Sequence, residues 1–199
     1  AWRQALELPV EALDATRLTA EADAQGVTVT VAGDGMLAVR DRHTQALRWW
    51  RVVCPAGAPP YPAYGLDAAR REAWRAAFGD ARQVHAEGPG GPVEVTDAPG
   101  FDPLTWRFHW ADIDLVALFS DGVEQVRQPA VSETSRTYTP VEVPEIIGDL
   151  LAIPFAHGQF VQRRARRALD RWTALGWRPF DDLGVAMIAC PDAPTDGAK

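Results

Sequence analysis

Four acidic residues beside apolar runs are the part of this sequence best suited to chemistry. Asp34 and Asp121 each stand where an apolar run ends and are followed by glycine, while Asp181 and Asp182 stand where another apolar run begins. A strand end holds a carboxylate rigidly, and the hard cations Mg²⁺ and Mn²⁺ prefer carboxylate and carbonyl oxygens. The pattern therefore indicates a divalent-metal site, although Asp-Gly is also one of the commonest turn dipeptides.

Periodicity and turn residues divide the chain into short strands and a few helices. Strands are expected over 17–24, 27–32, 36–40, 46–53, 81–85, 93–96, 106–110, 115–120 and 183–190, the first four as an antiparallel meander. Helices are expected over 1–13, 66–78, 123–128, 143–151 and 160–175. Residues 55–64 should form an ordered proline-rich loop, 88–92 and 97–103 turns, and 191–199 a polar tail.

This order of elements predicts an α+β fold, an antiparallel β-sandwich flanked by helices. Residues 1–190 are expected to form a single domain, because a chain of 199 residues suits one hydrophobic core and no clear linker divides it. Helices separate the strand that ends before Asp121 from the strand that begins after Asp182. The ends of these two strands can then meet at one rim of a sheet.

The net charge of −7 and the small number of cysteines, two, argue against several classes of protein. An acidic chain disfavours broad contact with nucleic acid or anionic membrane, and no apolar stretch reaches the roughly 18 to 20 residues that span a bilayer. Cys54 and Cys190 lack disulfide or zinc spacing, which predicts core thiols in a reducing compartment. We therefore expect a cytoplasmic protein with neither nucleic-acid nor membrane partners.

Three phrases of the sequence resemble motifs of the protein phosphatase 2C family. Residues 115–122, LVALFSDG, resemble the family phrase LLLCSDG. Residues 181–187, DDLGVAM, resemble DNxSVIL, and residues 33–39, GDGMLAV, resemble GDSRAVL. The phrases occur in the order that the family uses, so the chain resembles a divergent bacterial member.

The resemblance implies that Asp34, Asp121 and Asp181 are metal ligands, with Asp182 as the alternative to Asp181. It implies two or more Mg²⁺ or Mn²⁺ ions that activate a bridging water for attack on a phosphoserine or phosphothreonine of a phosphoprotein substrate. Asp34 would bind an accessory ion or orient waters. No catalytic residue beyond the metal ligands is implied, and the implied fold is the family's α-β-β-α sandwich.

Departures from the family pattern leave a second function open. Gly35 and Gly184 replace the usual hydroxyl residues, and Gln125 stands where many members place a further Asp. The family's first strands, with a phosphate-binding Arg and a metal-bridging Asp-Gly, have no match before Thr16. The chain begins at Ala1, so we expect either a piece of a longer protein that lacks its first strands or a degenerate relative. The alternative function is a catalytically inactive phosphatase-like domain that binds or regulates partners.

Other reactive side chains fit ordinary roles. The histidines are dispersed, and His157 is the best of them as an acid because the loop 154–158 can present it. Ser120 lacks the Gly-x-Ser-x-Gly setting of a nucleophile. Five arginines crowd the expected helix 160–175, which indicates a solvated face or, as the alternative, a docking surface.

Overall fold

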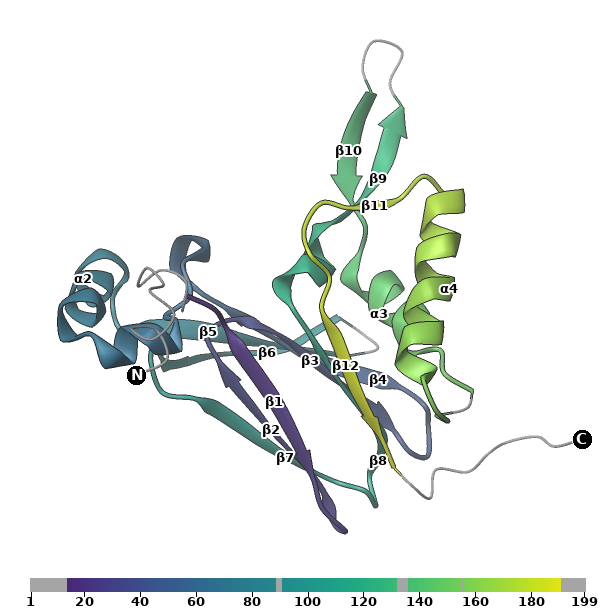
Figure 1. The fold of residues 1–199 in the computed structure, drawn as a ribbon, viewed down its shortest axis with the longest axis horizontal. Coiled ribbons are helices and arrows are strands. Elements are labelled where there is room, and N and C mark those ends of the chain that lie inside the picture. The colour runs from purple at the N-terminus through teal and green to yellow at the C-terminus, as the bar shows by residue number, and fades with distance from the viewer. Residues whose placement is uncertain (1–13, 89–90, 132–135, 155, 191–199) are drawn as a thin grey trace, which may run out of the picture. The chain divides into compact units, whose positions relative to one another are not determined.

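The computed structural model describes residues 14–88, 91–131, 136–154 and 156–190 (Figure 1). These residues form a mixed α+β structure with antiparallel sheets and three α-helices, consistent with the predicted sandwich. The strands are β1 (Arg17–Ala22), β2 (Gly26–Ala32), β3 (Gly35–Asp41), β4 (Leu47–Val53), β5 (Ala81–Gly88), β6 (Gly91–Pro99), β7 (Leu104–His109), β8 (Ile113–Phe119), β9 (Val126–Val131), β10 (Arg136–Pro140), β11 (Arg178–Pro179) and β12 (Val185–Ala189).

The α-helices are α2 (Ala68–Phe78), α3 (Val143–Leu151) and α4 (Phe160–Ala174). Short 3₁₀ helices are η2 (Pro55–Gly57), η3 (Pro62–Leu66) and η4 (Asp121–Gln125). The expected loop over 55–64 thus contains two such turns. The expected helix over 1–13 and the polar tail 191–199 lie outside the described residues.

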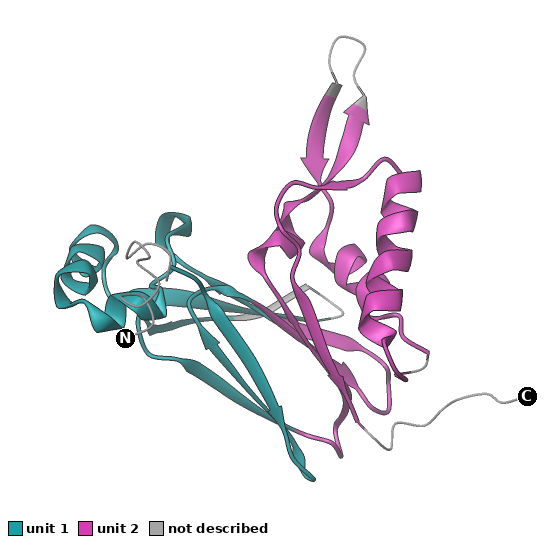
Figure 2. Cartoon of the chain, in the orientation of Figure 1, with its two compact units in different colours: residues 1–35, 50–108 teal, residues 36–49, 109–199 magenta. Residues whose placement is uncertain are grey.

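Residue contacts divide the chain into two compact units (Figure 2). Unit 1 contains residues 1–35 and 50–108, and unit 2 contains residues 36–49 and 109–199. The boundary between the units falls inside β4, so both units contain part of that strand. The single domain over 1–190 stays a prediction.

Unit 1 holds the sheet β1-β2-β7 and the antiparallel hairpin β5-β6. β1 pairs with β2 as expected, but β2 and β3 belong to different sheets, so the meander of neighbouring strands is wrong at this point. The reason lies in the turn between them, where Gly33 and Gly35 have φ angles of 103° and 119°. This left-handed backbone turns the chain out of one sheet and into the other.

The helix α2 of unit 1 shows how local sequence sets an element. Asp67 accepts hydrogen bonds from two backbone N–H groups of the first turn at 3.0 and 3.2 Å, and Gly79 ends the helix with φ 80°. Its buried Trp74 donates the indole N–H to the carbonyl of Ala58 at 3.0 Å. The predicted cap and end of this helix are confirmed.

In unit 2, β8 lies between β3 and β12 and pairs antiparallel with both. Every residue of β8 is buried, and its apolar run from Leu115 to Phe119 predicts a central strand. The strand also contains the buried Asp114, whose carboxylate pairs with Arg40 at 2.7 Å. The face of β8 that carries Leu115, Ala117 and Phe119 packs in one apolar cluster with residues of α3 and α4, which include Ile146, Ile147, Leu150 and Trp172.

The expected helix over 123–128 is wrong. η4 gives way at Val126 to β9, which pairs antiparallel with β10 and β11. Val126 is buried and β-branched, and Pro129 has no N–H for a helical hydrogen bond, so this segment favours a strand. The turn expected over 97–103 begins later than predicted, because β6 continues to Pro99.

Both cysteines are buried free thiols, as predicted. Burial raises the pKa of the Cys54 thiol to about 12, and the negative charge of Asp34 adds to the effect. Cys54 is therefore a neutral thiol at physiological pH, which suits a packing role. No helix in the described part of the chain is long and apolar enough to cross a membrane.

Candidate metal-binding rim

The ends of three strands meet at one level of the sheet in unit 2. Phe119, the last residue of β8, pairs with Met36 at the start of β3 and with Val185 at the start of β12. Since β8 runs antiparallel to both neighbours, its end lies beside their beginnings. Asp121 follows Phe119 by two residues, and Asp182 precedes Val185 by three. The register therefore brings the segments that carry these two acids to the same edge.

Ser120 ties the end of β8 to the segment before β12. Its hydroxyl donates to the carbonyl oxygen of Asp182 at 2.9 Å and accepts a hydrogen bond from the N–H of Gly184 at 2.8 Å. Its backbone N–H donates to the carbonyl oxygen of Gly184 at 3.1 Å. Gly122 packs so closely that a Cβ atom there would overlap the carbonyl oxygen of Asp182. Asp121, between Ser120 and Gly122, is thereby held beside the Asp-Asp segment.

The acids of this edge are Asp121, Asp181 and Asp182, which we call the carboxylate rim. All three are exposed residues, and Oδ1 of Asp181 accepts the backbone N–H of Asp182 at 2.8 Å. Exposed carboxylates suit a cation that keeps part of its water shell. Nearby, Oε1 of Gln125 accepts a hydrogen bond from Arg127 at 2.7 Å, so this amide is engaged within the chain.

Asp34 lies in unit 1, in the turn between β2 and β3. It is half-buried between Gly33 and Gly35, whose positive φ angles favour glycine. Burial raises the pKa of Cys54 and lowers the pKa of Arg82. The negative charge of Asp34 favours a higher pKa at both of these groups, which also belong to unit 1. The structure thus brings the backbone segments that carry Asp121 and Asp181–Asp182 to one edge of unit 2. Asp34, two residues before Met36 of β3, is part of unit 1.

Arg82 of β5 is a buried charge that the sequence analysis did not single out. It is 1% exposed, and its guanidinium donates to the carbonyl oxygen of Gly33 at 2.7 Å and to that of Asp102. Arg82 therefore holds the backbone immediately before Asp34. The sequence could have predicted that Arg82 is buried, because strand alternation places it on the same inward face as Val84.

The carboxylate rim offers oxygen donors for a metal ion. Among the residues that the structure describes, no group of three or more His, Cys, Asp or Glu side chains is arranged to hold a metal ion. Mg²⁺, however, commonly takes one or two protein carboxylates and completes its shell with water and substrate phosphate oxygens. The carboxylates of the rim could supply the one or two protein ligands that Mg²⁺ needs.

Ser120 and His157 have ordinary surroundings. The Ser120 hydroxyl already bonds two backbone groups, which agrees with a positioning role rather than a nucleophilic one. His157 is exposed in the loop before α4, and its carbonyl oxygen accepts a hydrogen bond from Arg163 at 2.6 Å. An acid role for His157 stays a prediction.

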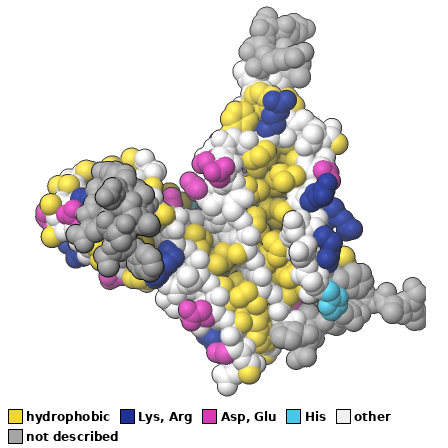
Figure 3. Space-filling view, in the orientation of Figure 1, with side chains coloured by type: hydrophobic (Ala, Val, Ile, Leu, Met, Phe, Trp, Pro, Cys, Tyr) yellow, Lys and Arg dark blue, Asp and Glu magenta, His cyan; other side chains and the backbone are white. Residues whose placement is uncertain are grey.

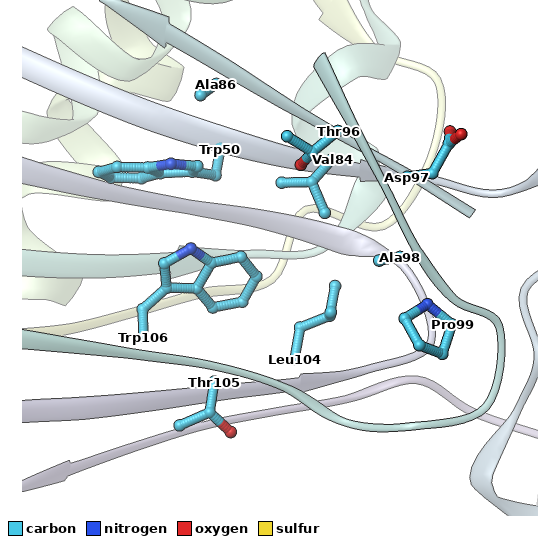
Figure 4. A pocket seen from close by; sticks show the side chains of 10 residues that line it. All are labelled: Trp50, Val84, Ala86, Thr96, Asp97, Ala98, Pro99, Leu104, Thr105 and Trp106. Carbon is cyan, nitrogen blue, oxygen red and sulfur yellow. The ribbon is translucent and has the colours of Figure 1, made fainter. Parts of the chain in front are cut away.

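Unit 1 contains a different kind of hollow, lined by residues of β4 to β7 (Figure 4). Its volume is about 370 Å³, and the indoles of Trp50 and Trp106 lie along it with Leu104 and Val84. Asp97 is the one acid in its described lining, and Figure 4 shows its carboxylate pointing away from the indoles. This hollow offers apolar surface but no combination of acid, base and nucleophile.

No protein-family model, curated protein or solved structure matches this chain. Of the described residues, those of the carboxylate rim combine a predicted chemistry with a geometry that joins distant parts of the sequence.

Proposed function

We propose that the protein is a metal-dependent phosphoprotein phosphatase of the 2C type, which hydrolyses phosphoserine or phosphothreonine esters. The observation that carries the proposal is the contact of Ser120 and Gly122 with the backbone of Asp182 and Gly184. This contact joins the Ser-Asp-Gly phrase after β8 to the Asp-Asp phrase before β12. Both phrases resemble metal-binding motifs of the family, and motifs that act on one metal site must be neighbours in space.

The chain's residues would divide the work as follows. Asp121 and Asp181 would hold Mg²⁺ or Mn²⁺, with Asp182 as the alternative to Asp181 and Asp34 as an accessory ligand. When bound, the ion would lower the pKa of a water to supply hydroxide and would neutralise charge on the phosphate. Ser120 positions the Asp182 segment through its two backbone hydrogen bonds. The exposure of the carboxylate rim leaves room for a protein substrate.

The fold supports this proposal at a coarse level. The described residues form antiparallel sheets with three helices, and in unit 2 the helices α3 and α4 pack on one face of β8. We further propose that these sheets and helices stack in the family's α-β-β-α order.

One observation favours a second candidate, a catalytically inactive phosphatase-like domain that binds or regulates a partner. Among the described residues, no group of three or more His, Cys, Asp or Glu side chains is arranged to hold a metal ion. A domain that has lost metal affinity would keep the packing of Ser120 and Gly122, because that packing also stabilises the sheet edge.

Hydrolysis of p-nitrophenyl phosphate with and without Mn²⁺ distinguishes the two candidates. The phosphatase should show hydrolysis that depends on Mn²⁺, and Asp121→Asn and Asp181→Asn should reduce it to the level measured without metal. Asp182→Asn, tested in parallel, decides which acid of the pair is the ligand. Asp170→Asn is the control, because Asp170 is an exposed acid on α4 outside the carboxylate rim.

Isothermal titration with Mn²⁺ completes the test. Binding that Asp121→Asn abolishes would support the metal site independently of the substrate. A folded protein that neither binds Mn²⁺ nor hydrolyses the ester would refute the phosphatase and favour the inactive domain.

A further inference from the structure

We propose that the groove between α4 and the β11–β12 segment of unit 2 binds an extended stretch of the phosphoprotein substrate, taking an apolar side chain of that stretch next to an acidic one. The proposal rests on the proposed function, because it concerns how the carboxylate rim would select its substrate. This face of unit 2 would then be a docking surface continuous with the carboxylate rim.

The groove has a volume of about 560 Å³ and a largely apolar lining. α4 contributes Val161, Ala165 and Leu169, which recur at every fourth position and so lie along one face of the helix. Leu183 and Val185 line the groove from the β12 side. A hollow of this size and composition suits one or two apolar side chains.

The groove adjoins the acids that would hold the metal. Asp181 and Asp182 both belong to its lining. From Val161 to Leu169 the axis of α4 rises about 12 Å, a length that an extended peptide covers in about four residues. A substrate with its phosphoresidue at the carboxylate rim would therefore place a side chain about two to four residues away in the groove. An extended segment is the occupant that this geometry favours.

Apolar side chains on this face are exposed to solvent. Leu169 is 41% exposed, and Phe180, just before the carboxylate rim, is 59% exposed. Figure 3 shows hydrophobic side chains forming a band over unit 2, with Lys or Arg side chains beside it. A contiguous apolar surface with a charged border is typical of a protein-interaction site.

Arg166 gives the groove a positively charged edge. It is exposed and lies one helical turn from Leu169, which lines the groove. Arg164 donates to the backbone carbonyl of Asp149, and Arg171 pairs with the carboxylate of the same residue. Arg166, by contrast, forms no ion pair with any residue that the structure describes. Its guanidinium is available to an acidic side chain of the bound segment.

Phosphopeptide hydrolysis tests the apolar part of the proposal. The probes are phosphothreonine peptides with Leu about three residues before or after the phosphothreonine and Asp beside the Leu, each matched by a peptide with Ser in place of Leu. We expect kcat/KM for one Leu peptide to exceed that for its Ser counterpart by about 10-fold or more. Leu169→Glu should remove this preference while hydrolysis of p-nitrophenyl phosphate is unchanged.

Leu175→Glu is the matched control, because Leu175 is 47% exposed at the end of α4 and is outside the groove lining. Equal rates for Leu and Ser peptides, or equal effects of the two Glu variants, would overturn the groove proposal alone. Absence of p-nitrophenyl phosphate hydrolysis in the unaltered protein would instead refute the proposed function. Fluorescence anisotropy of the unphosphorylated Leu peptide gives a second readout, in which Leu169→Glu should weaken binding and Leu175→Glu should not.

A charge-reversal pair tests the acidic part. Arg166→Glu should lower the preference for the Asp-containing peptide over its Asn counterpart, whereas Arg167→Glu should not. Arg167 is the control because it lies about 200° around the helix from Ala165, away from the groove. Sedimentation equilibrium checks a rival occupant: a dimer of the chain that Leu169→Glu dissociates would assign the groove to a second copy and overturn the proposal.

Discussion

Gly122 has no room for a side chain, because a Cβ atom would overlap the carbonyl oxygen of Asp182. We expect Gly122→Ala to push the Asp182 segment away from β8 and to lower the free energy of unfolding by about 1–3 kcal/mol. Gly148→Ala is the matched control: Gly148 lies in α3 with nothing within 4 Å of the added atom, so alanine should raise that free energy by up to about 1 kcal/mol. Urea unfolding measures both, and opposite signs are expected.

Cys54 makes a second residue-scale prediction, about alkaline pH. Burial raises the pKa of its thiol from 9.0 to about 12. Above about pH 9 the thiol ionises in the unfolded chain but stays neutral in the folded one, so its contribution to stability is complete below pH 9 and is lost by pH 12. Thermal melts between about pH 8 and 11 should show the unaltered protein losing stability faster than Cys54→Ala. Parallel pH profiles for the two proteins would contradict this.

At the scale of elements, one buried carboxylate joins two helices of unit 2. Asp149 of α3 accepts the indole N–H of Trp172 at 2.8 Å and pairs with Arg171, and both partners lie on α4. Trp172 is completely buried, so its N–H has no access to water if this acceptor is removed. This interaction explains why two of the five arginines of α4, Arg164 and Arg171, face α3 rather than solvent alone.

Asp149→Ala should lower the free energy of unfolding by about 2–3 kcal/mol, since it leaves a buried donor without a partner. Asp149→Asn keeps an acceptor for Trp172 and should cost less. Denaturant unfolding followed by circular dichroism compares both with the exposed Asp170→Asn, for which a change below about 0.5 kcal/mol is expected. A loss no larger for Asp149→Ala than for Asp170→Asn would show that the contact does not join the helices.

At the scale of the whole molecule, we expect Mn²⁺ to raise the thermal stability of the folded protein. A ligand that binds only the folded protein raises its stability by about 1.4 kcal/mol at ten times its dissociation constant. For a chain of this length the melting temperature should rise by roughly 3–5 °C. Thermal melts with Mn²⁺ and with excess chelator measure the shift.

Single-residue variants show which side chains bind Mn²⁺ in these melts. Asp121→Asn should abolish the shift caused by Mn²⁺. Asp34→Asn should reduce the shift, as the resemblance implies for an accessory ligand. An unchanged shift would contradict that role and leave Asp34 with its electrostatic effect on Arg82 and Cys54. No shift in the unaltered protein would count against the metal site as a whole.

Local signals were sufficient for the helices that the structure describes and for most strands. α3 has the predicted bounds, and α2 and α4 differ from the predicted ranges by at most two residues at each end. Caps such as Asp67 and Gly79 act through neighbours within one or two turns, so sequence alone locates them. The sequence analysis did not predict β9 and β10, because the residues after Gly122 have a helix-like pattern. Their strands form only through pairing with each other, which tertiary context decides.

From the sequence alone we could predict the acidic strand ends and the buried apolar run of β8, both of which the structure shows. The family that three short phrases resemble stays a prediction. Only tertiary structure decided that Ser120 and Gly122 contact the backbone of Asp182, which lies 62 residues after Ser120. It likewise decided that Arg82 donates to the carbonyl oxygen of Gly33, 49 residues earlier in the chain. Strand register and side-chain packing depend on partners that are distant in the chain, whereas periodicity and capping depend on near neighbours. Only the former bring separate acids to one edge of a sheet.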